Sequence, residues 1–197
     1  MTMKKMTITA LALALAFTAG SAAAASKDSY TFVEAGLANL DVSDAPSMNG
    51  AYLRGSYDFG SYDFGSVYTA ARVTQVDTKI SGVKVKLEDY DVGLGLQRQH
   101  GKANFFGEAA YQKTKGSAVG LSSSGDGYRI GAGVKADLAP KLEGLAQVNY
   151  RDGDSYESET SGVLGLRYAF AQNWSVSGTG EFGDQTKLYN LGVRYGF

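Results

Sequence analysis

The sequence predicts an all-β chain that closes into an antiparallel, up-and-down transmembrane β-barrel of about ten strands. Three observations carry this prediction. Apolar and polar residues alternate with a period of two in segment after segment, aromatic residues recur near the segment ends, and tight connections alternate with longer polar ones. The composition agrees, because 26 glycines, 13 tyrosines, two prolines and no cysteine are unlike collagen, a proline-rich disordered tail or a disulfide-stapled domain.

The first 25 residues are predicted to be a signal peptide. Two positive charges, Lys4 and Lys5, precede an apolar run over Thr7–Phe17, and the small residues Ala23 and Ala25 fit a cleavage site. A membrane anchor would need about 20 apolar residues, so the run is too short for one. Cleavage leaves 17 basic and 20 acidic side chains, a net charge of −3. That charge offers no electrostatic footprint for nucleic acid, and we expect no such partner.

Residues 26–197 are predicted to form the barrel, and the C-terminal segment shows the strand pattern most clearly. Its apolar positions are Tyr189, Leu191, Val193, Tyr195 and Phe197, and its polar or small positions are Asn190, Gly192, Arg194 and Gly196. One face is therefore aromatic or branched, and the other carries an amide, a guanidinium and glycine, which is typical of a two-faced strand.

Nine earlier segments repeat this alternation. In chain order they cover residues 30–40, 50–59, a segment from 66, then 90–96, 104–112, 128–135, 142–150, 161–170 and 174–182. Their apolar faces are, in the same order, Val33, Ala35 and Leu37; Ala51, Leu53 and Tyr57; Val67, Ala71 and Val73; Tyr90, Val92, Leu94 and Leu96; Phe105, Ala109 and Tyr111; Tyr128, Ile130, Ala132 and Val134; Leu142, Ala146, Val148 and Tyr150; Leu164, Leu166, Tyr168 and Phe170; Trp174, Val176 and Phe182.

The charges on the opposite face favour a barrel whose apolar side faces lipid. A soluble sandwich also alternates, but its polar face is wet and has no need of charge balance. Here six acids are matched by six bases, which suits a closed lumen because a buried charge without a partner is costly. We expect these charges to face the lumen: Glu34, Asp58, Asp91, Glu108, Glu143 and Glu181 with Arg54, Arg72, Arg129, Lys135, Arg167 and Arg194.

Aromatic residues and glycines support the same arrangement. Rings near the strand ends predict two interfacial girdles. We expect them to contain Tyr30, Tyr57, Tyr111, Tyr128, Tyr150, Tyr168, Phe170, Trp174 and Phe182. The pairs Gly93/Gly95 and Gly131/Gly133 lack the third glycine and the helix of a dinucleotide motif, and are better explained as small residues in a crowded lumen.

The connections alternate in length. Gln99–Lys102 and Ala171–Asn173 are tight, whereas Asp41–Asn49, Lys113–Asp126 and Asp152–Glu159 are longer and polar. Short periplasmic turns and longer outer loops are the expected asymmetry, and an even strand number puts both termini on the periplasmic side.

Two local features interrupt the regular pattern. The segment Ser56–Gly60 is copied at once as Ser61–Gly65, and a five-residue copy reverses the faces, so we expect a lengthened periplasmic turn. Further on, Val76 and Ile80 have the opposite parity to Val73, which predicts a bulge where a hairpin with its turn at Ser81–Gly82 leaves the bilayer. This hairpin is either an arm that presents a receptor or adhesion site, or a simple overhang of the strands.

The mature chain resembles the small bacterial outer-membrane proteins, the OmpA/OmpX-type and small porin-like barrels, on its leader, its even strand count and its C-terminal Val193–Phe197. It is also similar to a porin-like subset described as vesicle-associated or immune-stimulating. The resemblance implies the outer membrane of a Gram-negative bacterium and contact with its lipid. It also implies that the barrel-assembly machinery reads Leu191, Val193, Tyr195 and Phe197 during biogenesis.

Nothing in the sequence indicates catalysis or a cofactor. The single histidine, His100, lies in a tight turn without the acid that a catalytic triad needs. The acidic segment Asp152–Glu159 lacks the twelve-residue pattern of a calcium loop. We expect a protein that is not an enzyme and has no catalytic, cofactor or metal site.

Two functions from different classes remain. The first is a porin-like, narrow passive channel for ions or small solutes, in which the luminal charges select what passes. The second is a sealed structural or adhesive surface protein, which meets an extracellular ligand or surface partner through its outer loops. They differ in whether luminal side chains pair with one another, which the sequence alone does not specify.

Overall fold

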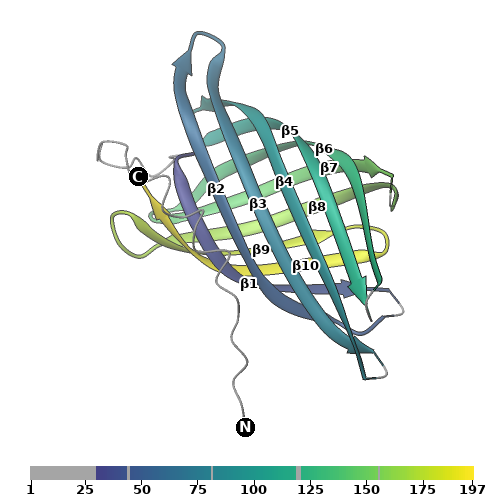
Figure 1. The fold of residues 1–197 in the computed structure, drawn as a ribbon. Coiled ribbons are helices and arrows are strands. Elements are labelled where there is room, and N and C mark those ends of the chain that lie inside the picture. The colour runs from purple at the N-terminus through teal and green to yellow at the C-terminus, as the bar shows by residue number, and fades with distance from the viewer. Residues whose placement is uncertain (1–29, 44, 81, 119–120, 155) are drawn as a thin grey trace.

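The computed structural model describes residues 30–197 apart from 44, 81, 119–120 and 155, so the predicted signal peptide lies outside the described residues. Over these residues the chain forms ten antiparallel strands that close into one barrel, which confirms the predicted fold class (Figure 1). The strands are β1 (Phe32–Val42), β2 (Met48–Tyr62), β3 (Gly65–Ile80), β4 (Val83–His100), β5 (Ala103–Ala118), β6 (Leu121–Ala139), β7 (Leu142–Gly153), β8 (Tyr156–Ala169), β9 (Trp174–Phe182) and β10 (Thr186–Gly196). Within the described part of the chain, no helix is long and apolar enough to cross a membrane.

Each strand pairs with its neighbours in sequence, and β1 closes the barrel by pairing with β10. This closing ladder runs from Phe32 opposite Gly196 to Val42 opposite Thr186. Closure leaves no sheet edge along the paired lengths, so the backbone amides and carbonyls there are satisfied within the sheet. The start of β1 and the end of β10 lie at the same end of the barrel as the β2–β3 hairpin (Figure 1); we call this the terminal end and the opposite one the outer end.

The outward side chains form an apolar belt around the barrel. Leu37, Leu94, Ile130, Leu164 and Leu191 are each more than half exposed on this surface. Aromatic rings flank the belt on both sides. Toward the terminal end these are Tyr57, Phe105, Tyr168, Phe170, Trp174 and Tyr195, and toward the outer end Tyr90, Tyr111, Tyr128, Tyr150, Phe182 and Tyr189. The expected girdles are present, except that Tyr30 lies inside the barrel at 4% exposure.

Beyond the girdle at the outer end, the apolar residues of β3 and β4 occupy inward-facing positions instead of outward-facing ones, and no bulge accompanies this change. The β3–β4 ladder keeps one register from Ser66 opposite Gln97 to Ile80 opposite Val83, so the predicted bulge is wrong. Val76 is 2% exposed inside the barrel. The parity of the strand is constant and only the chemistry of its faces changes, as expected where a strand passes from hydrocarbon into water.

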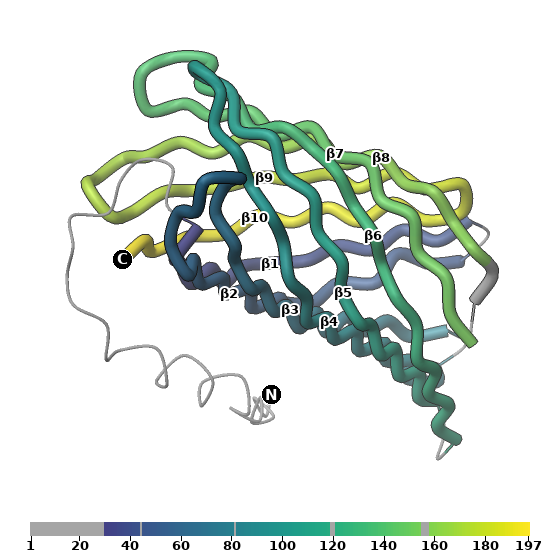
Figure 2. The backbone as a smooth tube through the Cα atoms, turned by 90° about the horizontal axis from the view of Figure 1, so that it is seen from above, coloured from purple at the N-terminus to yellow at the C-terminus, as the bar shows by residue number. Residues whose placement is uncertain are grey.

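The outer connections are short, and the predicted long loop over Lys113–Asp126 is wrong. Strands β5 and β6 pair through this segment up to Ala118 opposite Leu121, beyond the last β6–β7 pair at Gly127. The β5–β6 hairpin therefore extends past β7 (Figure 2), whereas on its other side β4 pairs with β5 up to Val85 opposite Ala118. Asp152–Glu159 is likewise mostly strand in its described residues, whereas the first outer connection does contain non-strand residues at 43 and 45–47. The hairpin turn expected at Ser81–Gly82 lies between the paired Ile80 and Val83, with Ser81 outside the described residues.

The duplicated five-residue segment forms a bulge and a turn. The β2–β3 register shifts between Asp58 and Ser61, and the strands then pair again up to Tyr62 opposite Gly65. Gly60 and Gly65, the last residue of each copy, have φ values of 106° and 137°, which favour glycine. Part of the segment is a turn, as expected, but the turn is not lengthened: it consists of Asp63 and Phe64, because the copies instead extend β2 to Tyr62 and β3 begins at Gly65.

Luminal glycines provide room where side chains cross the interior. A Cβ atom added at Gly95 would lie 2.2 Å from Cζ of Tyr68, and one added at Gly131 would lie 2.4 Å from Oδ1 of Asn149. Both side chains are almost fully buried. The expectation that these glycines serve a crowded lumen is therefore confirmed.

We expect Gly93→Ala to destabilise the barrel by about 1–3 kcal/mol, because its Cβ would lie 2.4 Å from the backbone oxygen of Ala109. Gly107→Ala is the matched control, since the nearest atom to its added Cβ is 3.9 Å away. Urea unfolding of both variants in lipid vesicles measures the difference. Equal unfolding free energies would contradict the steric account.

Candidate functional site in the barrel lumen

The register of the barrel places interior charges side by side. Across β10, β1, β2, β3 and β4, one row of directly opposed interior residues reads Arg194, Glu34, Arg54, Arg72 and Asp91. Each arginine in this row has an acid beside it. Neighbouring charges of opposite sign stabilise such a row, and the two opposed arginines, Arg54 and Arg72, each turn to a different acid.

Glu34 holds the strands at the closing seam. Its side chain is 1% exposed. Its two carboxylate oxygens accept hydrogen bonds from Arg54 Nη2 and Arg194 Nε, each at 2.7 Å, and Tyr52 donates a further one at 2.8 Å. These donors belong to β2 and β10, on either side of β1. The guanidinium of Arg194 also lies 3.7 Å from the ring centroid of Phe32, so both its charge and its flat face have partners.

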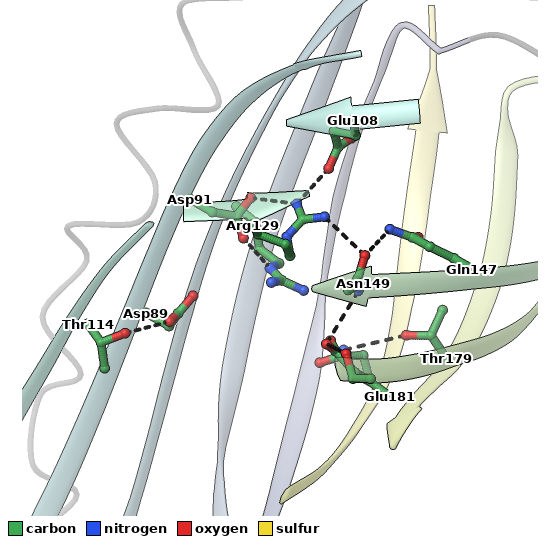
Figure 3. Close-up of polar contacts among 12 residues, drawn as sticks. Asp89, Asp91, Glu108, Thr114, Arg129, Gln147, Asn149, Thr179 and Glu181 are labelled. Atoms are coloured by element: carbon green, nitrogen blue, oxygen red, sulfur yellow. Dashed lines mark hydrogen bonds and ion pairs between the residues drawn. The ribbon is translucent and has the colours of Figure 1, made fainter. Parts of the chain in front are cut away.

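A second cluster centres on Arg129 from β6 (Figure 3). Its Nη2 atom lies 2.5 Å from Glu108 Oε1 and 3.5 Å from Asp91 Oδ1, and Asp91 also accepts from Arg72 Nε at 2.8 Å. Nη1 of Arg129 reaches Asn149 Oδ1 at 3.5 Å. Residues of β3, β4, β6 and β7 are thus joined in one network.

Glu181 extends the polar network to the far wall, where Glu143 pairs with Arg167. Ser161 donates to Glu181 Oε1 at 2.7 Å, and Asn149 donates to the same oxygen at 3.4 Å (Figure 3). Arg167 makes a two-bonded contact with Glu143, at 3.1 Å from Nε and 2.8 Å from Nη2. Such paired, charge-assisted hydrogen bonds hold both side chains in one orientation.

Aromatic rings narrow the lumen at the terminal end. The rings of Tyr30 and Tyr68 have centroids 4.5 Å apart. The ammonium of Lys135 lies 3.6 Å from the centroid of Tyr30 and 5.3 Å from that of Phe106. Lys135 is thereby held largely by ring faces, to which a cation is attracted.

Apolar side chains narrow one side of the lumen toward the outer end. Ala38, Tyr52 and Val76 form a buried cluster. Further apolar residues pack on it from β1, β2, β4 and β10, namely Leu40, Met48, Leu87 and Leu188. These residues form a small hydrophobic core inside the barrel at the level where the outward face of the strands is in contact with water.

Three neighbouring spaces lie in the lumen of the described residues. Their volumes are about 10 Å³ at the terminal end, about 120 Å³ in the middle and about 230 Å³ toward the outer end. Tyr30 and Lys135 line both the terminal and the middle spaces, and Arg72 and Glu181 line both the middle and the outer ones. The middle space has room for on the order of ten water molecules.

The structure brings the residues expected in the lumen together. Eleven of the twelve line the middle space: Glu34, Arg54, Arg72, Asp91, Glu108, Arg129, Lys135, Glu143, Arg167, Glu181 and Arg194. Asp58 accepts from Gln97 and Ser66 at the terminal end. Sequence reasoning missed Asp89, Arg151 and Glu159, although each lies two residues from an inward position and so shares its face.

The other residues considered for chemistry stay apart. His100 is exposed at the end of β4. Glu159 turns inward to an ion pair with Arg151, so the acidic segment does not converge on a common point. In the described part of the chain, no group of three or more His, Cys, Asp or Glu side chains could hold a metal ion.

The C-terminal residues lie on the outer surface of the barrel. Leu191 and Val193 are 58% and 46% exposed. The ring of Tyr195 packs against Trp174 and Phe197, with centroids 5.0 and 5.1 Å apart.

Ion pairs replace the apolar belt on the outer face of the β3–β4 extension. Lys84 lies 3.1 Å from Asp77, and Lys86 lies 2.5 Å from Glu88. The hydrogen bond from Lys86 lowers the pKa of Glu88, and the positive charge adds to this effect. The first pair is exposed and the second is half-buried, and both suit contact with water.

Comparison with known proteins bears on the fold. No protein-family model matches the chain, and no curated protein matches it in sequence. Among solved structures, the β domain of the Bordetella autotransporter Brka superposes with a TM-score of 0.54 at 16% identity, over 84% of this chain and 98% of that one. Ail, the attachment invasion locus protein of Yersinia pestis, superposes with a TM-score of 0.48 at 16% identity, over 83% of this chain and 95% of that one. The KdgM porin superposes with a TM-score of 0.43 at 13% identity, over 85% of this chain and 99% of that one. The fold is that of the small outer-membrane β-barrels.

We expect Glu34→Gln to lower the free energy of unfolding by about 3–5 kcal/mol, because it leaves the buried Arg194 and the half-buried Arg54 without their shared, fully buried acid. Asp77→Asn, which breaks an exposed pair on the outer face, should cost less than about 1 kcal/mol. Urea unfolding in vesicles compares the two. A cost for Glu34→Gln no larger than that for Asp77→Asn would show that the seam does not depend on this acid.

Proposed function

We propose that the protein is an integral barrel of the Gram-negative outer membrane whose lumen is sealed, and that it acts at the cell surface through its outer hairpins. The apolar belt with its two aromatic girdles supports the membrane setting, since it matches what hydrocarbon and its interfaces require of a barrel. The predicted signal peptide supports export. The exposed C-terminal pattern of Leu191, Val193, Tyr195 and Phe197 supports recognition by the barrel-assembly machinery.

The pairing of the luminal charges with one another is the observation that supports a sealed lumen. Glu34, Asp91, Glu108 and Glu143 each contact an arginine within the barrel. Eight strands enclose an interior that side chains fill, and ten strands are not much wider. A hydrated solute would have to break these buried ion pairs to pass, and doing so is costly.

The projecting hairpins support a surface role. The β3–β4 and β5–β6 hairpins rise above the outer girdle as regular strands with polar outward faces. A paired sheet is a rigid base for presenting side chains, whereas a long loop is not.

The three internal spaces favour a second candidate, a narrow passive channel. They follow one another along the lumen and have charged linings. The narrowest space lies at the terminal end, beside Tyr30 and Lys135. In this alternative these two residues limit the current and the arginines and acids select the ion.

We expect deletion of Ser117–Ser124 to abolish binding of bacteria to host-cell or abiotic surfaces while the barrel stays folded. The deletion leaves Thr114 and Gly125, which are already paired, joined by the two-residue turn Lys115–Gly116. The readouts are adhesion of cells that carry the variant and faster gel migration of the unboiled barrel. Unchanged adhesion with a folded barrel would count against the surface role of this hairpin.

We expect the intact protein to give no discrete conductance steps in planar bilayers, and Tyr30→Ala to add only brief openings, since the ion pairs of the middle space persist. Tyr57→Ala, which removes a girdle ring of the same type from the outer surface, is the control. Regular steps from the intact protein, enlarged by Tyr30→Ala but not by Tyr57→Ala, would make the channel the correct function.

A further inference from the structure

The space toward the outer end of the lumen has two chemically different walls. Strands β10, β1, β3 and β4 supply an apolar wall of Leu188, Leu40, Val76 and Leu87. The other lining residues are polar or charged and come from β3, β4, β5, β7, β8, β9 and β10; they form a polar wall of Arg72, Thr74, Asp89, Gln112, Thr114, Arg151, Glu159, Glu181 and Thr186. At about 230 Å³ the space is smaller than a drug-sized pocket but large enough for a small organic molecule.

The polar wall holds more acid than base. Its two arginines are already engaged, Arg72 with Asp91 and Arg151 with Glu159. Among the described residues, neither Asp89 nor Glu181 has an ion pair. Asp89 accepts a hydrogen bond from Thr114 at 2.9 Å, and Glu181 accepts from Ser161 and Asn149 (Figure 3). With three acids against two arginines, the lining has a net negative charge, which attracts a cation.

The apolar wall narrows the choice of cation. A metal ion prefers several oxygen ligands around it and gains nothing from leucine and valine. An ammonium with a short alkyl body fits both walls, because the ammonium donates to the carboxylates while the alkyl chain lies against Val76 and Leu87. We infer that the outer part of the lumen is a binding site for small amphipathic organic cations, of the alkylammonium class. This site requires no conduction through the barrel.

The test is isothermal titration calorimetry of the purified full barrel in a non-ionic detergent with n-butylammonium, methylammonium and n-butyrate. We expect n-butylammonium to bind and n-butyrate not to bind. The three additional methylenes should make n-butylammonium about 50-fold tighter than methylammonium, from about 0.8 kcal/mol for each buried methylene.

Two variants locate the site. Asp89→Asn keeps an acceptor for the hydrogen bond from Thr114 but removes the negative charge, so it should weaken the binding of both ammonium ions at least tenfold. The control Asp77→Asn, on the outward face of β3, should change neither affinity. Val76→Thr keeps the side-chain volume but makes the wall less apolar. It should therefore reduce only the difference in affinity between n-butylammonium and methylammonium. Butyrate binding as tight as butylammonium binding, or equal affinities for Asp89→Asn and Asp77→Asn, would overturn the inference. Gel migration of the unboiled variants verifies that each barrel is folded.

Discussion

The contact between Glu34 and the two arginines opposite it is the interaction on which the rest of the structure depends. A sheet of ten strands has two edges, and in a hydrocarbon environment both must be paired. The edges meet at β1 and β10, where Glu34 lies directly opposite Arg194 and, on its other side, opposite Arg54. A shift of one residue would turn Glu34 out of the barrel. The buried acid therefore fixes the register in which the barrel closes.

That register determines which luminal charges pair with one another and how densely side chains fill the lumen. Because opposed residues on neighbouring strands lie side by side, each arginine in the row from Arg194 to Asp91 has an acid next to it, and Arg129 joins Asp91 to the far wall. Long arginine side chains then cross the interior, and glycines such as Gly95 leave room for Tyr68. The same filling of the lumen is the basis for proposing that the barrel is sealed, and the outer space lies above the network.

The strands, their faces and the luminal charges could be predicted from the sequence, because a period of two is a local property. The partners of Glu34 could not, since the register is set by pairing between residues up to 160 positions apart. The bulge near Val76 and the loop over Lys113–Asp126 were wrong for one shared reason. An apolar outer face was assumed along the whole strand, whereas the strands continue into water and reverse the chemistry of their faces. Tyr30 was assigned to a girdle because nothing local shows that it turns into the lumen.

The change of faces along β3 is therefore the most direct test of the account. The chain has no cysteine, so single cysteines introduced along β3 carry nitroxide labels without background. Their accessibility to oxygen, which enters lipid, and to a water-soluble nickel chelate can be measured in vesicles. We expect oxygen access at 67, 71 and 73, nickel access at 75, 77 and 79, and little of either at 74 and 76. Oxygen access at 76 and 78, as a bulge would require, would contradict the account.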